Sequence, residues 1–168
     1  MKNSNSIHII GGGLAGSEAA WQLARFNIPV TIHEMRPVKM TEVHKTANFS
    51  ELVCSNSFRS DDHENNAVGL LHQELRINKS LIMHCADQSK IPAGGALAVD
   101  RNKFSSLVSE KIINHNLITI NREEVKDLSC FSSEDIILIS TGPLTSESLA
   151  NEIILNLSLI HISEPTRQ

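Results

Sequence analysis

The stretch that decides the fold is residues 7–34, IHIIGGGLAGSEAAWQLARFNIPVTIHE. A short apolar run precedes Gly11, Gly13 and Gly16, an alanine-rich segment with helical periodicity follows, and a second apolar run ends at Glu34. Strand, glycine turn, helix, strand and acid in this order predict a βαβ dinucleotide-binding unit. Gly11 permits the tight turn out of the strand, Gly13 lets backbone amides approach a pyrophosphate, and Gly16 lets the helix pack closely on the sheet.

The ligand phosphates are expected at the start of this helix, where unpaired N–H groups and the helix dipole favour an anion. Glu34 follows the second strand, Val30 to His33, where a carboxylate can accept hydrogen bonds from ribose hydroxyls. That carboxylate would repel a 2′-phosphate, which argues against NADP, although nearby Arg36 leaves NADP possible. The fingerprint does not choose between FAD and NAD, and a plain structural turn is the alternative to binding.

Length and composition limit what the chain can be. Its 168 residues can bury one substantial core, which fits one dinucleotide domain with an insertion. The net charge of −4 gives no global case for nucleic-acid binding, so any basic patch must be local. We expect a cytoplasmic protein without membrane attachment, because there is no signal-peptide character and no bilayer-length apolar stretch. Three widely spaced cysteines fit a reduced compartment, and the histidine spacing predicts no metal site.

Periodicity predicts the remaining elements. Residues 41–66 are polar and lack helical or strand periodicity, so they are either functional or disordered. We expect one amphipathic helix from Val68 to Met83 and a loop at Ile91–Ala96, whose Gly94 and Gly95 allow close backbone approach. A second helix is expected from Arg101 to about Asn114, capped by Asp100. Short strands are expected at Leu117–Ile120 and Val125–Leu128, and a buried strand at Ile136–Ile139.

Two further features could carry chemistry. The strand at 136–139 ends in Ser-Thr-Gly-Pro, and ligands of open α/β sheets bind just outside the carboxyl ends of strands; a strand-ending turn is the alternative. Cys54 lies among hydrogen-bond donors, and the positive charge of Arg59 would favour the nucleophilic thiolate. A single cysteine is more often a small buried hydrophobe, and this description fits Cys85 and Cys130 better.

Seven sequence blocks in a fixed order carry a resemblance to a known family. They are IIGGGLAGSEAAWQLA (9–24), HEMRP (33–37), ELVCSNSFRS (51–60), NAVGLLHQELR (66–76), SLIMHCAD (80–87), PAGGALAVDR (92–101) and STGPLTS (140–146). From about Ile7 to Ala150 the chain resembles the folate- and FAD-dependent tRNA (uracil-5-)-methyltransferases. The resemblance implies an α/β fold, a Rossmann-like FAD-binding domain of the glutathione-reductase-like type with an inserted helical and loop segment at about 41–100.

The resemblance also implies a reaction. A methylene group from methylenetetrahydrofolate would pass to C5 of the T-loop uridine of tRNA, reduced FAD would supply electrons, and NADH or NADPH would regenerate the flavin. A thiolate that adds to C6 of uracil makes C5 nucleophilic. Cys54 matches the family's cysteine in the CSNS block and is the catalytic candidate, acting on uracil or on the flavin-bound carbon. The alternatives are a related flavoprotein that modifies the wobble uridine of tRNA, and a non-catalytic dinucleotide-binding module.

By the same resemblance the cofactor site can be assigned residue by residue. The pyrophosphate of FAD would lie on Gly11, Gly12, Gly13, Leu14, Ala15 and Gly16, its ribose on Glu34 with Arg36 nearby, its adenine at the backbone of Val125, and the dinucleotide would also touch Thr141 and Gly142. Residues 92–101 are expected near the isoalloxazine or the folate, with a helix-capping loop as the alternative. Arg36, Lys39, Lys45 and Arg59 could contact tRNA phosphates or the folate glutamate, or form a solvated charged face.

The chain departs from the family at its end. Family members are more than twice as long, and neither their later glycine-containing segment nor their second cysteine is matched here. We therefore expect residues 1–156 to be the N-terminal part of an FAD/NAD(P)-binding domain truncated at the C-terminus. Residues 157–168 are expected to be a non-native, adapter-derived tail. Such a fragment would be inactive alone and would leave a sheet edge unpaired.

Overall fold

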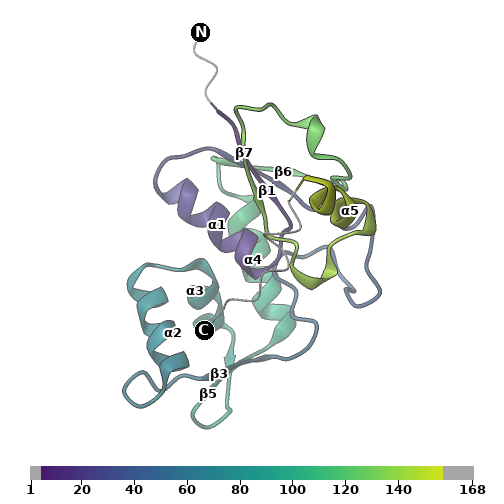
Figure 1. Cartoon of the computed structure of the whole chain (residues 1–168). Coiled ribbons are helices and arrows are strands. Elements are labelled where there is room, and N and C mark those ends of the chain that lie inside the picture. The colour runs from purple at the N-terminus through teal and green to yellow at the C-terminus, as the bar shows by residue number, and fades with distance from the viewer. Residues whose placement is uncertain (1–4, 157–168) are drawn as a thin grey trace, which may run out of the picture.

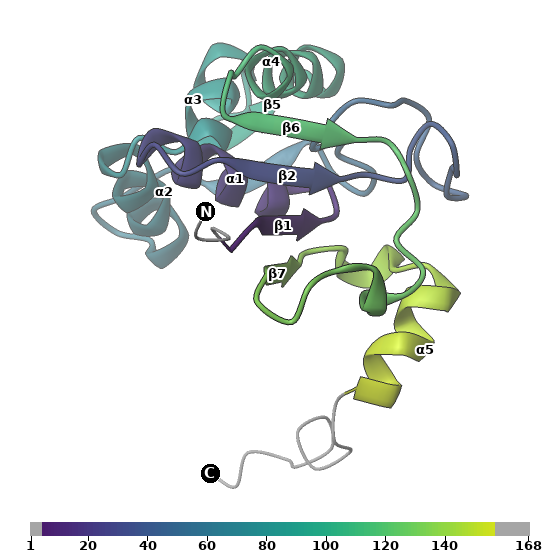
Figure 2. The same ribbon diagram turned by 90° about the horizontal axis from the view of Figure 1, so that it is seen from above.

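The computed structural model describes residues 5–156 (Figure 1). Its central feature is a four-stranded parallel sheet with the order β6-β2-β1-β7, which Figure 2 shows. β1 (Ile7–Ile10) lies between β2 (Val30–His33) and β7 (Ile136–Ile139). β6 (Ile118–Asn121) pairs with the other side of β2. The expected Rossmann-like α/β fold is confirmed. The tail at 157–168 lies outside the described residues.

Helices pack mainly on one face of this sheet. α1 (Leu14–Arg25) and α4 (Arg101–Ile113) pack on one face, as Figure 2 shows, and Asp100 caps α4 as predicted by accepting the Lys103 N–H. α5 (Glu147–Asn156) packs on the other face, where its Leu149 contacts Ile10 of β1. Two short 3-10 turns, η1 (Leu128–Cys130) and η2 (Gly142–Leu144), flank β7 in the sequence.

The strand order marks the place where a ligand is expected. The chain runs from β1 to β2 and then to β6, always toward one edge, and β7 then returns to the opposite side of β1. In open α/β sheets, ligands bind outside the carboxyl ends of the strands at such a switch point. The carboxyl ends of β1 and β7 are therefore the first place to look for a site.

Residues 41–100, expected as an insertion of helices and loops, contain a second sheet. Three short antiparallel strands form it in the order β3-β5-β4, and two helices accompany it. The elements are β3 (Ser57–Ser60), α2 (Ala67–Ile77), α3 (Leu81–Gln88), β4 (Lys90–Ile91) and β5 (Ala96–Val99). The polar stretch therefore includes a strand, and the expected loop at 91–96 lies between two.

The single helix predicted from Val68 to Met83 is wrong, because the chain turns sharply between α2 and α3. Lys79 adopts a left-handed conformation with φ 56°, and the Ser80 hydroxyl then caps α3 by accepting the Met83 N–H at 3.1 Å. The Glu18 carboxylate of α1 accepts the Ser80 hydroxyl at 2.8 Å. The apolar periodicity continues across this break, so it could not reveal the turn.

Two strand predictions also need correction. β7 is not buried, because it is the edge strand among the described residues and its Ile136 side chain is 54% exposed. Residues Val125–Leu128 form no strand: Val125 packs against Ile10 and Leu149, and Leu128 begins η1. Both segments are apolar, but neither forms a strand in the interior of the sheet. Residues 136–139 form an edge strand, and Val125 packs against Ile10 and Leu149 from a segment without regular structure.

No other part of the described protein closely approaches Gly94 or Gly95, and their close approach to a bound ligand stays a prediction. A Cβ added to either residue would meet no atom within 4 Å. Gly94 has φ 62°, so glycine is needed there for the conformation of the turn between β4 and β5.

One apolar core joins the parallel sheet to residues 41–100. Ile9 and Ile32 of the sheet belong to the same buried cluster as Leu97 of β5, Met83 of α3 and Phe104 of α4. The second sheet and its helices are therefore fixed in position relative to the dinucleotide unit. Among residues 5–156, no helix is long and apolar enough to cross a membrane.

We expect Gly16→Ala to lower the free energy of unfolding. A Cβ at residue 16 would collide with the carbonyl oxygen of Gly11 and lie 2.6 Å from Ser140 Oγ. Overpacking a core costs about 1–3 kcal/mol, and the upper end is expected here because a backbone carbonyl cannot easily move. Urea denaturation measures the loss.

Gly13→Ala is the matched control. Its Cβ would meet no atom within 4 Å and its φ is −75°, so only the weaker N-cap preference of alanine applies, roughly 1 kcal/mol or less. Equal losses for the two variants would contradict close packing at Gly16.

Candidate functional site

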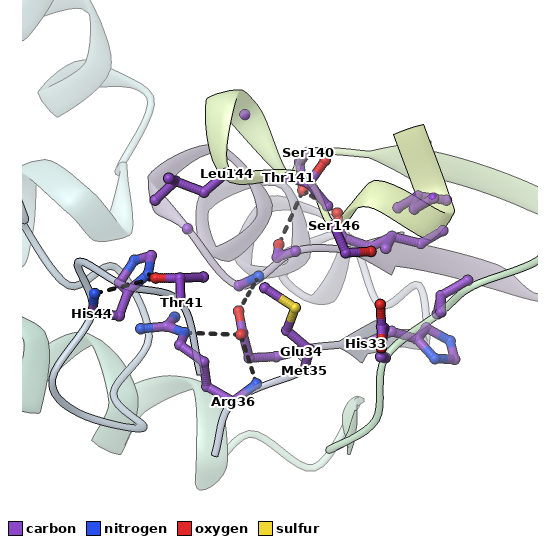
Figure 3. A pocket seen from close by; sticks show the side chains of 18 of the residues that line it. His33, Glu34, Met35, Arg36, Thr41, His44, Ser140, Thr141, Leu144 and Ser146 are labelled. Atoms are coloured by element: carbon purple, nitrogen blue, oxygen red, sulfur yellow. Dashed lines mark hydrogen bonds and ion pairs between the residues drawn. The ribbon is translucent and has the colours of Figure 1, made fainter. Parts of the chain in front are cut away.

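A cavity of about 290 Å³ opens at the carboxyl ends of β1, β2 and β7, the place that the strand order indicates (Figure 3). Its volume is near the lower limit for ligand pockets. Ten of the twelve predicted site residues line it: Gly11, Gly12, Gly13, Leu14, Ala15, Glu34, Arg36, Val125, Thr141 and Gly142. Gly16 lies buried in α1 behind the wall, and Cys54 lies outside the lining.

Gly11 makes the turn from β1 into the glycine loop, as predicted. Its φ is 105°, and its amide donates to the His33 carbonyl at 2.8 Å. A Cβ on Gly11 would lie 2.9 Å from the Ser140 carbonyl, so the ends of β1 and β7 touch through this glycine. The Ser140 hydroxyl fixes the contact by donating toward the Ile10 and Gly11 carbonyls, both at 3.0 Å.

The start of α1 is suited to an anion. Gly13 is its N-cap and provides no side-chain cap, and the first turn contains no acidic residue. The first amides of the helix therefore remain without a side-chain acceptor at the cavity wall. The space beside Gly13 is open, because an added Cβ would meet no atom within 4 Å.

Glu34 is buried, with 5% of its surface exposed, and it holds the glycine loop. Oε2 accepts the Gly12 N–H at 2.8 Å, while Oε1 accepts the backbone N–H of Arg36 at 3.0 Å and its Nε at 2.9 Å. Burial alone would raise the pKa of the Glu34 carboxyl, but these hydrogen bonds and the Arg36 charge bring it below its ordinary value. The ionised carboxylate has about four acceptor positions, so one remains for a ribose hydroxyl.

Arg36 is a structural cation of the cavity wall. Its side chain is 3% exposed, pairs with Glu34 and reaches Glu51 Oε2 at 3.3 Å. Glu51 also accepts the amides of Lys45 and Thr46, each at 3.0 Å, and the Thr46 hydroxyl at 2.7 Å. Burial opposes ionisation of Glu51, but these hydrogen bonds lower its pKa. Arg36 thus holds the segment before β3 against the end of β2.

This burial bears on the basic residues considered for tRNA or folate. Arg36 is enclosed by carboxylates and cannot present its guanidinium on the surface. Lys39 is engaged with Glu124 at 2.6 Å. Lys45 and Arg59 are exposed, and Arg59 adopts φ 71° within the irregular pairing of β3.

Phe49 supports the glycine loop from behind, a role that no sequence pattern predicts. Its fully buried ring lies against Gly12, where a Cβ would collide with it. The Arg122 guanidinium carbon lies 4.3 Å from the centre of the same ring, and Arg122 Nη1 donates to the Arg36 carbonyl at 2.9 Å. Gly12 is thus required for space, a constraint that the fingerprint alone did not predict.

His33 also lines the cavity and was not predicted. Its Nε2 lies 3.0 Å from His8 Nδ1, and Phe131 packs against both rings. Burial first, and the neighbouring His8 second, lower the pKa of His33, so this imidazole is neutral at pH 7. His33 therefore adds no positive charge to the cavity at the end of β2, next to Glu34.

Six further lining residues are not among the predicted site residues, although some of them lie in segments that were linked to the site. They are Met35, Thr41, His44, Leu144, Ser146 and Leu149, several of which Figure 3 labels. The polar stretch after residue 40 was recognised as functional or disordered, and this composition was the one available signal for Thr41 and His44.

The three cysteines differ sharply. Cys85 is fully buried, and burial raises the pKa of its thiol to about 11, so it remains an unreactive thiol at pH 7. Cys130 was expected to be buried but is exposed, because its apolar neighbours form η1 on the surface. Cys54 is exposed on the segment that links the cavity wall to β3.

That segment is fixed on both sides of Cys54. Before it, the Ser50 amide donates to the Gly12 carbonyl at 2.9 Å and the Ser50 hydroxyl to Ser17 Oγ at 3.1 Å. After it, the Asn56 carbonyl accepts the Val99 amide at 2.9 Å. The Cys54 thiol thus lies on a short segment, residues 51–55, whose two ends are hydrogen-bonded to the glycine loop and to the second sheet.

The chemistry of the cavity lining suits the phosphate and ribose part of a dinucleotide such as FAD. It offers amides at a helix start for phosphate, a buried ionised carboxylate with one acceptor position left for ribose, and an apolar wall that includes Val125 and Leu149. Because Glu34 also occupies the Gly12 amide, phosphate contacts would come from the residues after Gly12.

The chain is similar to known proteins. The family model described as glucose inhibited division protein A matches residues 6–156. The methylenetetrahydrofolate–tRNA-(uracil-5-)-methyltransferase TrmFO of Bartonella bacilliformis is 61% identical over 147 residues, which cover 88% of this chain and 31% of that protein. The protein of the same name from Mesorhizobium japonicum is 61% identical over 151 residues, covering 90% and 32%. The chain therefore spans about a third of the length of the curated relatives it matches.

Among solved structures, GidA of Aquifex aeolicus in its form II crystal superimposes with a TM-score of 0.57 at 19% sequence identity. It covers 73% of this chain and 20% of the GidA chain. At this identity the match supports the fold alone.

Glu34→Gln is expected to destabilise the protein by about 3 kcal/mol at pH 7, because it leaves Arg36 as a buried cation with a weaker partner. The pKa of Glu34 is lower in the folded state than its ordinary value of 4.5. Its stabilising contribution is thus complete above that value and is lost as the pH falls through the folded-state pKa. The difference between wild type and variant, measured by urea denaturation, should therefore shrink in acid.

Glu42→Gln provides the control, since Glu42 is exposed in the neighbouring segment. It should change stability by less than about 0.5 kcal/mol at any pH. A Glu34→Gln difference that stays constant into acid would show that the carboxylate charge is not what holds the loop.

Proposed function

The chain belongs to the glucose inhibited division protein A family, and from this premise we propose that the complete protein is a folate-dependent tRNA methyltransferase that forms 5-methyluridine in the T loop. The observation that carries the proposal is the 61% identity, over about nine-tenths of this chain, to two proteins named as methylenetetrahydrofolate–tRNA-(uracil-5-)-methyltransferases. The glycine loop and Glu34 line a cavity at the switch point of the sheet, which supports a nucleotide cofactor at this position.

We propose FAD as the cofactor of the cavity, methylenetetrahydrofolate as the carbon donor and NADH or NADPH as the reductant. FAD, when bound, would supply the electrons that turn the transferred methylene group into a methyl group. The chain's own residues would position it: the helix start after Gly13 would hold the pyrophosphate, and Glu34 would orient the ribose. Thr141 and Gly142, which follow β7, would contact the dinucleotide from that side of the cavity.

Cys54 is the proposed catalytic residue. Its thiol is exposed on a segment held by the glycine loop, so a uridine of a bulky RNA could reach it without entering the cavity. A thiolate that adds to C6 of uracil would push the ring electrons toward C5 and make this carbon nucleophilic, and its later elimination would restore the ring. Attack on the flavin-bound carbon is the alternative role. We place the reaction in the cytoplasm, where free cysteines remain reduced.

A wobble-uridine-modifying flavoprotein is the second candidate, because the matching family model is described as glucose inhibited division protein A. The chain is 19% identical to the solved GidA structure and 61% identical to a protein named as a tRNA (uracil-5-)-methyltransferase. The higher identity favours the methyltransferase activity. A non-catalytic dinucleotide-binding module is the third candidate. The position of the new methyl group in tRNA separates the first two, and its absence would favour the third.

Cys54→Ala in the complete gene product is expected to abolish 5-methyluridine formation, because alanine removes the nucleophile. The assay uses an unmodified tRNA transcript, methylenetetrahydrofolate with an isotopically labelled methylene group and mass spectrometry of the digested tRNA. Flavin absorbance of the purified variant should remain, since Cys54 lies outside the cavity lining.

Cys130→Ala is the matched control, because Cys130 is also exposed and the substitution is the same. This variant should methylate as the wild type does. Retained labelling of T-loop uridine by Cys54→Ala would reject the catalytic assignment, and labelled wobble uridine would reject the methyltransferase proposal itself.

A further inference from the structure

A second hollow, of about 580 Å³, lies among the helices away from the strand ends. α1, the turn between α2 and α3, α3 and α4 form its walls, and these helices pack against one another (Figure 1). Trp21 and Arg25 contribute from the last part of α1, Lys79 from the turn, and Lys111 from α4. Neither the cofactor cavity nor the proposed chemistry uses these residues.

The hollow is positively charged, although the whole chain has a net charge of −4. Four Lys or Arg side chains line it against one carboxylate, Asp87. Asp87 is paired with Arg76 at 2.7 Å, and Asp61 reaches the same guanidinium at 2.9 Å, so the Arg76 charge is compensated. Among residues 5–156, the remaining three cations form no ion pair with a carboxylate.

Local structure presets the positions of two of these cations. Arg25 Nη1 donates to the Asn78 carbonyl at 2.6 Å, which holds the guanidinium against the turn between α2 and α3. Lys79 has φ 56°, and its amide donates to the Arg76 carbonyl at 2.9 Å, so its side chain leaves from a fixed turn. Glu18 is the acid of α1 closest to this turn, and its carboxylate already accepts the Ser80 hydroxyl and the Ile82 amide.

Trp21 gives the hollow an aromatic wall. It is the one tryptophan of the sequence, it is half-buried, and it meets His115 edge-on with ring centres 5.6 Å apart. Aromatic faces that stack bases, combined with cations that track phosphates, are the means by which proteins bind unpaired RNA nucleotides. An acidic peptide would use the cations but would have no need for a flat aromatic wall.

We propose that this hollow binds an unpaired nucleotide of tRNA away from the target uridine, with phosphates on Arg25, Lys79 and Lys111 and a base on Trp21. The assignment rests on the proposed function, which makes tRNA the partner. α1 begins at the cofactor cavity and ends at the hollow, and its 12 residues span about 18 Å at 1.5 Å per residue. A folded RNA can bridge that distance and contact both places.

The test measures the affinity of the complete gene product for a fluorescent tRNA transcript at several salt concentrations. The variant Lys79→Asn/Lys111→Gln removes two cations, and asparagine tolerates the left-handed conformation at residue 79. We expect about tenfold weaker binding at low salt and a slope of log affinity against log salt that is smaller by about 1.5. Lys103→Gln is the charge-matched control for Lys111→Gln, because Lys103 is exposed on the same helix outside the hollow.

Trp21 is tested separately. Trp21→Leu should weaken binding by about fivefold or more with no change of the salt slope, and Trp21→Phe should restore most of the affinity because it keeps an aromatic face. Unchanged thermal melting of each variant shows that the effects are not losses of fold.

Methyluridine formation, measured in the same samples, separates this proposal from the proposed function. Wild-type affinity and salt slope in the double variant would overturn the hollow as an RNA site, even if methylation is intact. The expected slope change without any methyluridine would support the hollow and overturn the proposed function. Competition by poly-L-glutamate as strong as that by RNA would overturn the assignment to RNA.

Discussion

The buried carboxylate of Glu34 is the group on which the arrangement of the cavity depends. It accepts hydrogen bonds from the Gly12 amide of the glycine loop and from the Arg36 side chain at the end of β2. Arg36 in turn donates a hydrogen bond to Glu51. A carboxylate this deeply buried would be costly without such partners. Because Glu51 also accepts the amides of Lys45 and Thr46, a chain of charge-assisted hydrogen bonds runs from the sheet into the polar segment before β3.

This network explains why a long polar stretch is ordered. Segment 41–51 has little apolar surface of its own, but it supplies Phe49, whose buried ring fills the space behind Gly12, and its end is fixed at Ser50 by the Gly12 carbonyl. The glycine at position 12 therefore serves the protein's own packing as well as any ligand. Without Phe49 the loop would lose the ring that fills the space behind it. Phe49 is itself held by the apolar core and by its amide, which donates to Ser109 Oγ at 2.8 Å.

The parts of the fold and site that the sequence predicts are those encoded locally. The turn at Gly11, the close packing at Gly16 and the carboxylate at Glu34 follow from spacing within one βαβ unit. The roles of Phe49 and Ser140 could not be predicted, because each contacts the glycine loop from far along the chain. The edge position of β7 depends on sheet order, and the turn at Lys79 depends on contacts with Glu18, so periodicity could show neither.

The same network limits where Cys54 can be. The Ser50 amide is hydrogen-bonded to the glycine loop, and Cys54 follows four residues later. Four residues of extended chain span at most about 14 Å. The thiol therefore cannot lie far from the helix start that would hold the cofactor phosphates. Asn56, bonded to Val99 of β5, limits it from the other side. The core shared by β5 and the parallel sheet makes both anchors rigid relative to each other. A nucleophile outside the cavity lining can therefore still be held at a set distance from it, which is what a reaction between a bound cofactor and a large external RNA requires.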